Sequence, residues 1–128
     1  MANFTFDHIH LRSPDIEATA AWFEEKLGAK VSRVMAQGRP RMVLTLGGTT
    51  ILINQADANT AAPPSAPNQG VDHFGLAVQG LDEAVAELKA KGVPFTMEIT
   101  EARPGVRICF IRGPENISIE LLERQPGA

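Results

Sequence analysis

The stretch DHIHLRSPDIEATAAWFEEKLG, residues 7–28, recurs in altered form as DHFGLAVQGLDEAVAELKAKG, residues 72–92. A shift of 65 residues aligns Asp7 with Asp72 and His8 with His73, and the apolar positions that follow stay in register. This self-similarity indicates that one short module is used twice. The segment between the two copies, ADANTAAPPSAPNQG, is rich in Pro, Ala, Ser and Asn, which predicts an exposed connection.

Each copy begins with a strand-like stretch, at residues 4–11 and 71–78, and continues with an amphipathic helix. The first helix is expected to start at a polar cap, Ser13 or Asp15, and to stop at Gly28, while the second is expected to stop at Gly92. Three further strand-like runs follow each helix, namely KVSRVMA, RMVLTLG and TTILINQ, then PFTMEIT, GVRICFI and NISIELLE. The pattern predicts an α+β protein of two tandem βαβββ modules.

The size and charge of the chain limit the classes of protein to which it can belong. Its 128 residues are expected to form a single domain, and a net charge of -3 with scattered Lys and Arg argues against nucleic-acid binding. A lone cysteine, Cys109, allows no internal disulfide, and no stretch has the features of a signal peptide or a membrane span. We therefore expect a cytoplasmic protein, with a first module over about 3–56, a linker over about 57–70 and a second module over about 71–124.

Three residues are candidates for a metal site because of the strand faces they occupy. Side chains alternate across a strand, so His8, His73 and Glu120 lie opposite the strongly apolar faces expected to pack on the helices. All three are expected in the middle of strands, where a buried carboxylate is unfavourable without a partner. Two imidazoles and one carboxylate can hold a divalent ion and leave positions open for water or substrate. The simpler interpretation is that the histidines are ordinary packed residues and that Glu120 is solvated.

These motifs, with GPENISIELLE at residues 113–123, resemble the vicinal-oxygen-chelate superfamily over nearly the whole chain. The superfamily includes glyoxalase I, methylmalonyl-CoA epimerase, extradiol dioxygenases, fosfomycin-resistance enzymes and metal-free bleomycin-binding proteins. The resemblance implies that eight strands of the two modules form a curved mixed sheet around a metal cleft. It also implies one divalent ion per site, which could be iron, manganese, nickel, cobalt or zinc.

Residue by residue, the resemblance places the metal ligands of the family at His8, His73 and Glu120. Arg12 is similar to an arginine that contacts glutathione in glyoxalase I, so it is the candidate substrate-binding residue. The fourth glyoxalase ligand, a glutamate, falls on Leu52, or on Asn54 if the alignment shifts by two, and neither residue carries a carboxylate. The chain also contains no tyrosine, so the tyrosines of extradiol dioxygenases and fosfomycin-resistance enzymes are absent.

Several other polar residues could contribute to the chemistry. His10 shares its strand face with His8 and is, with Glu120, a candidate catalytic residue that could transfer a proton. One or two of the arginines of the cleft-forming strands and loops could bind a substrate carboxylate or phosphate, the four candidates being Arg39, Arg41, Arg103 and Arg107. Cys109 lies between apolar neighbours and is expected to be a packed residue rather than a nucleophile.

Three functions remain open at this point. The first is a glyoxalase-like lyase or isomerase whose small substrate binds the metal through adjacent oxygens. The second is an iron(II) extradiol-type dioxygenase, and the third is a non-catalytic protein that binds a small drug molecule. We also expect a homodimer of two-fold symmetry, the commonest closed assembly, with the metal site formed within one chain or across two.

Overall fold

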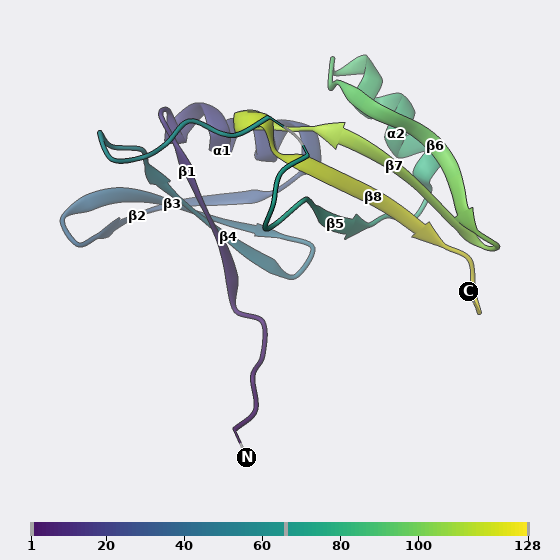
Figure 1. Cartoon of the computed structure of the whole chain (residues 1–128), viewed down its shortest axis with the longest axis horizontal. Coiled ribbons are helices and arrows are strands. Elements are labelled where there is room, and N and C mark those ends of the chain that lie inside the picture. Colours follow the sequence, from purple (N-terminus) through teal and green to yellow (C-terminus); the bar gives the residue numbers. More distant parts are fainter. Residues whose placement is uncertain (1, 66, 128) are drawn as a thin grey trace. The chain divides into compact units, whose positions relative to one another are not determined.

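The computed structural model describes residues 2–65 and 67–127; Met1, Ala128 and Ala66, which falls within the expected linker, lie outside the described residues. The chain divides into two compact units, Met1–Ala62 and Pro63–Ala128. Each unit has the element order βαβββ, as the sequence repeat predicts, and each has its own helix and sheet (Figure 1). The α+β fold of two tandem βαβββ modules is therefore confirmed.

The first unit is a four-stranded mixed sheet with one helix. Its strands lie in the order β1-β4-β3-β2, with β1 parallel to β4 and the other two pairings antiparallel. The elements are β1 (His8–Ser13), α1 (Ile16–Leu27), β2 (Lys30–Ala36), β3 (Arg39–Leu46) and β4 (Thr49–Gln55).

The second unit repeats this topology with the strand order β5-β8-β7-β6. Here β5 runs parallel to β8, and the register shifts between β6 and β7 interrupt their ladder. Hydrogen bonding thus joins the eight strands into two sheets of four. The elements are β5 (Phe74–Ala77), α2 (Leu81–Ala90), β6 (Phe95–Arg103), β7 (Val106–Arg112), a short 3-10 turn η1 (Pro114–Asn116) and β8 (Ser118–Arg124).

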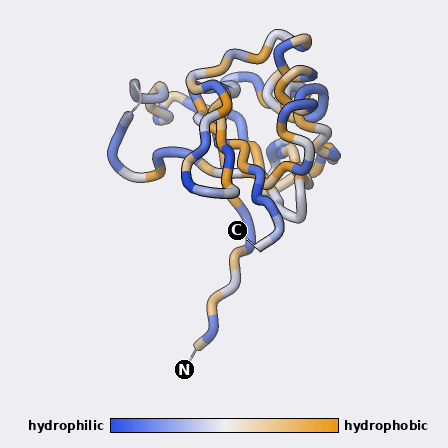
Figure 2. The backbone as a smooth tube through the Cα atoms, turned by 90° about the vertical axis from the view of Figure 1, so that its right-hand side faces the viewer, coloured by the Kyte–Doolittle hydropathy of each residue, from blue (hydrophilic) through white to orange (hydrophobic). Residues whose placement is uncertain are grey.

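The first strand of each unit begins later than the sequence pattern predicts. Strand β1 starts at His8, which pairs with Thr50 near the beginning of β4, and the described residues 2–7 lie before this paired segment. Phe4 and Phe6 are 92% and 73% exposed, on a segment that extends away from the sheet of its unit (Figure 2). Strand β5 likewise starts at Phe74, opposite Ile119 of β8. The alternating pattern is local, whereas the partner strand decides where pairing starts.

Helix α1 has the caps expected from the sequence. Asp15 is the N-cap, and its carboxylate accepts a hydrogen bond from the Ala18 amide at 3.0 Å. Gly28 ends the helix with a φ of 75°, in the left-handed region that glycine adopts without strain. Ser13, the alternative cap, is instead buried and its hydroxyl lies 2.7 Å from that of Thr19.

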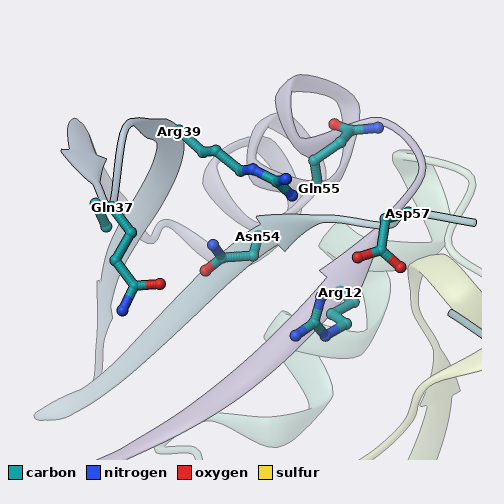
Figure 3. A pocket seen from close by; sticks show the side chains of 7 residues that line it. Arg12, Gln37, Arg39, Asn54, Gln55 and Asp57 are labelled. Carbon is teal, nitrogen blue, oxygen red and sulfur yellow. The ribbon is translucent and has the colours of Figure 1, made fainter. Parts of the chain in front are cut away.

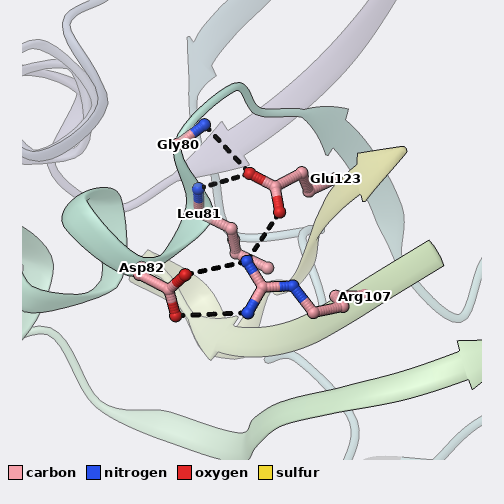
Figure 4. A network of polar contacts seen from close by, with 5 residues as sticks. All are labelled: Gly80, Leu81, Asp82, Arg107 and Glu123. Atoms are coloured by element: carbon pink, nitrogen blue, oxygen red, sulfur yellow. Dashed lines mark hydrogen bonds and ion pairs between the residues drawn. The ribbon is translucent and has the colours of Figure 1, made fainter. Parts of the chain in front are cut away.

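Helix α2 has no side-chain cap from its own first turn, and a carboxylate on strand β8 caps it instead. Glu123 accepts hydrogen bonds from the amides of Gly80 and Leu81 at 3.0 and 2.9 Å. Arg107 of β7 bonds to Glu123 at 2.6 Å and to Asp82 of the helix at 2.9 Å (Figure 4). This network ties the start of α2 to two strands of its own sheet.

Each unit buries one face of its sheet, as the alternation predicts. In the first unit the fully buried side chains include Phe23, Leu44 and Ile53, and in the second they include Ile119 and Leu121. The opposite faces are half-buried or exposed and carry the polar residues discussed below. No helix among the described residues is long and apolar enough to cross a membrane.

Candidate functional site

His73 and Glu120 lie together on the open face of the second sheet. His73 immediately precedes β5, and Glu120 lies in β8 opposite Gly75, whose lack of a side chain leaves the space beside the carboxylate open. The Nε2 atom of His73 is 3.1 Å from Oε1 of Glu120, and its Nδ1 atom is 2.8 Å from Oδ2 of Asp72. The imidazole and the Phe110 ring form a T-shaped pair with 4.8 Å between their centroids. The imidazole is thus held between two carboxylates.

This arrangement requires a cation at Nε2 of His73. Nδ1 faces the carboxylate of Asp72 and must carry a proton to bond with it, so in the neutral ring Nε2 presents a lone pair to Glu120. The hydrogen bond to Asp72 raises the pKa of His73, burial opposes it, and Glu120 raises the pKa further. The contacts with Asp72 and Glu120 thus favour the cationic form of the ring over the neutral form.

A divalent metal ion fits the same place. Two ligand atoms bound at about 2.1 Å from one ion and at right angles to each other lie about 3 Å apart. The observed separation of 3.1 Å between Nε2 of His73 and Oε1 of Glu120 matches that value. An imidazole nitrogen and a carboxylate oxygen are common ligands of zinc, iron, nickel and manganese. The donor set of His73 and Glu120 thus fits a divalent ion.

The first unit contains a second histidine in the same local arrangement. Nδ1 of His8 lies 2.7 Å from Oδ2 of Asp7, which leaves Nε2 of His8 available as a ligand. The orienting carboxylate is therefore repeated with the histidine, as Asp7 and Asp72. The sequence repeat aligns these two aspartates but indicates no role for them. The feature that could have revealed an orienting role is the aspartate that directly precedes each histidine.

The positions of the three candidate ligands differ from expectation in one respect. Only Glu120 lies in the middle of a strand. His8 is the first residue of β1 and His73 lies just before β5, because pairing begins later than predicted. His73 and Glu120 belong to the second unit and His8 to the first. Among residues 2–65 and 67–127, neither unit by itself contains three or more His, Cys, Asp or Glu side chains grouped to hold a metal. The three-ligand set thus stays a prediction.

The strand register identifies the residue that replaces Glu120 in the first unit. Glu120 pairs with Gly75 in the second sheet, and Leu52 pairs with His10 in the first. His10 and Gly75 are equivalent under the sequence repeat, so Leu52 occupies the position of Glu120. The first unit therefore supplies no carboxylate there.

The open face of the first sheet also carries a polar cluster of His10, Asn54 and Arg41. Nε2 of His10 lies 2.6 Å from Oδ1 of Asn54, and Nε of Arg41 donates to the same oxygen at 2.8 Å. The ring of His10 lies edge-on to that of His8, with 6.4 Å between the centroids. Arg41, expected as a possible anion-binding residue, is thus engaged with Asn54.

A cavity of about 310 Å³ lies at the end of this face, lined mainly by polar residues (Figure 3). Hydrogen bonds from Thr60 and from the Asn59 backbone lower the pKa of Asp57, and the guanidinium groups of Arg12 and Arg39 lower it further. The lining residues are Arg12, Ala36, Gln37, Arg39, Asn54, Gln55 and Asp57.

The remaining candidate residues, three arginines and Cys109, differ in how exposed they are and in which groups they contact. Of the other arginines considered, Arg39 lines the cavity, Arg103 is exposed, and Arg107 is occupied by the ion pairs with Asp82 and Glu123. Cys109 is fully buried, and burial raises the pKa of its thiol to about 11, which disfavours a nucleophilic thiolate. Cys109 is therefore a packed core residue, as expected.

The chain is similar in sequence to several known proteins. YwkD of Bacillus subtilis is 27% identical over 91% of this chain and 94% of its own length. Lactoylglutathione lyase GLX1 of Arabidopsis thaliana is 25% identical over 97% of this chain, which spans only 46% of that protein.

Solved structures share the fold. A glyoxylase/bleomycin resistance protein/dioxygenase domain from Frankia sp. EAN1pec matches with a TM-score of 0.81 and 23% identity, over 99% of this chain and 96% of its own. The fosfomycin resistance protein FosX of Listeria monocytogenes matches with a TM-score of 0.73 and 20% identity, over 98% and 97%. The family model of the Glyoxalase/Bleomycin resistance protein/Dioxygenase superfamily matches residues 5–121. With a match of that extent and the paired βαβββ units, the chain belongs to this superfamily.

Proposed function

We propose that the protein is a divalent-metal-dependent lyase or isomerase of the glyoxalase type, with His8, His73 and Glu120 as the metal ligands. The observation that carries the proposal is the placement of His73, whose Nδ1 is bonded to Asp72 while Nε2 faces Glu120 at 3.1 Å. A neutral imidazole and a carboxylate that face each other at this distance need a cation between them. The similarity to lactoylglutathione lyases supports the choice of reaction class.

The third ligand is assigned by the repeat. Asp7 orients His8 as Asp72 orients His73, and His8 follows its aspartate at the equivalent position of the first module. Either the same chain or a second copy could supply His8 to the pair formed by His73 and Glu120. A divalent ion held by these residues would act as a Lewis acid toward a substrate that offers two adjacent oxygen atoms.

The remaining polar residues of the first unit would bind the substrate and move a proton. Arg12 lines the 310 Å³ cavity with Arg39, and two guanidinium groups suit a carboxylate or phosphate at one end of the substrate. His10 would take a proton from the hydroxyl-bearing carbon next to a carbonyl and return it to the carbonyl carbon. The hydroxyl proton would move to the other oxygen, so the isomerisation loses no atoms.

An iron(II) dioxygenase is the second candidate, favoured by Leu52. Leu52 occupies the position at which glyoxalase I has its fourth metal ligand, and a leucine side chain cannot bind a metal. Two histidines and one carboxylate with open positions form the ligand set typical of non-haem iron oxygenases. A dioxygenase would require iron(II) and consume oxygen, whereas a lyase or isomerase would work anaerobically with zinc, nickel, cobalt or manganese.

The test is the metal content of purified protein. After chelation, the protein is titrated with each divalent ion, and the stoichiometry is compared among the wild type and the variants His8→Ala, His73→Ala and Glu120→Ala. Each variant should lose most of the bound metal, and Leu52→Ala serves as the matched control that keeps it. A wild type that binds no divalent ion would contradict the proposal and favour a metal-free binding protein. Variants that bind as well as the wild type would show that these residues are not the ligands.

A further inference from the structure

The cluster of His10, Asn54 and Arg41 places three polar side chains at positions where the fold does not require them. By strand register, the equivalent positions of the second sheet are Gly75, Leu122 and Ile108. Since the second unit builds the same four-stranded sheet with these apolar residues, the polar cluster is not needed to form the sheet. Its residues are therefore candidates for a functional role.

The hydrogen-bond directions in the cluster follow from Arg41. A guanidinium group is always protonated and can only donate, so its Nε–H at 2.8 Å identifies the facing atom of Asn54 as the carboxamide oxygen. That same oxygen is the atom 2.6 Å from Nε2 of His10. An amide oxygen can only accept, so Nε2 of His10 must carry the proton. The second nitrogen of the neutral ring, Nδ1, then holds the lone pair.

We propose that Asn54, held by Arg41, is a positioning residue that fixes His10 with its proton on Nε2 and its lone pair on Nδ1. Because Nε2 is occupied by the bond to Asn54, Nδ1 is the ring nitrogen that can accept a hydrogen bond or a proton from a bound molecule. The inference rests on the proposed function only for the use of Nδ1 as the proton acceptor.

The cluster also adjoins the cavity. Asn54 pairs in register with both Arg12 and Arg41, and its side chain lines the cavity with Arg12 and Arg39 (Figure 3). A small ligand held by the two cavity guanidinium groups would therefore lie next to the residue that orients His10.

The test is nitrogen-15 NMR of the imidazole rings in metal-free protein at a pH where His10 is neutral. The chain has three histidines, so His10→Ala suffices to assign the His10 signals. In the wild type, His10 should show a protonated Nε2, an unprotonated Nδ1 and an observable Nε2–H signal slowed in its exchange with water. This measurement does not need a bound metal or a known substrate, so it stands apart from the proposed function.

Two variants change the hydrogen bonding in different ways. Asn54→Leu, which copies Leu122 of the second unit, should abolish the protected Nε2–H signal and shift both nitrogens toward a tautomer mixture. Arg41→Met frees the amide to rotate and should give a weaker version of the same change. Asn54→Asp keeps an acceptor for both donors and should retain the wild-type tautomer.

The matched control is Gln55→Leu, which removes the neighbouring amide, whose contact is with the Pro14 carbonyl rather than with His10. It should leave the His10 signals unchanged. A wild-type His10 protonated on Nδ1 would overturn the proposal. So would an Asn54→Leu variant whose His10 signals match those of the wild type.

Discussion

Replacing Asp72 with asparagine should weaken metal binding without removing any ligand. Oδ2 of Asp72 lies 2.8 Å from Nδ1 of His73, so it favours the tautomer that would present Nε2 to the proposed metal and would make the imidazole a stronger donor. Loss of such a partner raises the dissociation constant by about 10- to 100-fold. Because Asp72 exposes 61% of its side chain, solvent screening should bring the effect near the lower end, about 10-fold.

The equivalent substitution at Asp7 provides a comparison for the size of the effect on metal affinity. Asp7 makes the equivalent contact to His8 at 2.7 Å but exposes 90% of its side chain, so Asp7→Asn should have the smaller effect. The assay is competition for zinc against a fluorescent chelator, run on both variants and on His73→Ala. Wild-type affinity in Asp72→Asn beside a complete loss in His73→Ala would refute the orienting role of Asp72. A larger loss in Asp7→Asn than in Asp72→Asn would refute the argument from exposure.

Four further measurements address other parts of the molecule. Arg107 lowers the pKa of Asp82 from its ordinary value of 3.8 and the pKa of Glu123 from its ordinary value of 4.5. Their ion pairs therefore stabilise the fold fully above these ordinary values and progressively less as the pH falls through the lowered ones. Glu123→Gln should lower the melting temperature at neutral pH and reduce its dependence on acid, as measured by circular dichroism. His10→Ala should lower turnover by about two to four orders of magnitude with metal content intact, and full activity would exclude a proton-transfer role. Arg12→Ala should raise KM for an anionic substrate while leaving metal stoichiometry unchanged, and an unaltered KM would remove Arg12 from the binding site. Light scattering should give the mass of a homodimer, and a concentration-independent monomer mass would contradict the expected assembly.

The two modules could be predicted from the sequence because the patterns that define each helix and strand lie within that element. The period of apolar residues, the polar N-cap and the Gly28 stop act within one element. The structure has the stop at Gly28, and of the two candidate caps, Ser13 and Asp15, it has Asp15. The repeat aligns Asp7 with Asp72 and His8 with His73 through residue identity alone. Face alternation placed Glu120 opposite the buried Ile119 and Leu121, and burial confirms it.

The partners across strands could not be predicted from the sequence. Strand starts at His8 and Phe74 depend on where β4 and β8 begin, which no local pattern encodes. The cap of α2 by Glu123 joins residues more than 40 positions apart, as does the bond between His10 and Asn54.

The repeated βαβββ topology and the residue types available for metal chemistry follow from the amino-acid sequence alone, because side-chain periodicity and capping are short-range properties. The contacts of His73 with Glu120 and Asp72, and the bonds of Asn54 to Arg41 and His10, arise only in the folded chain. Such contacts depend on sheet register, and a shift of one residue would move every side chain to the opposite face.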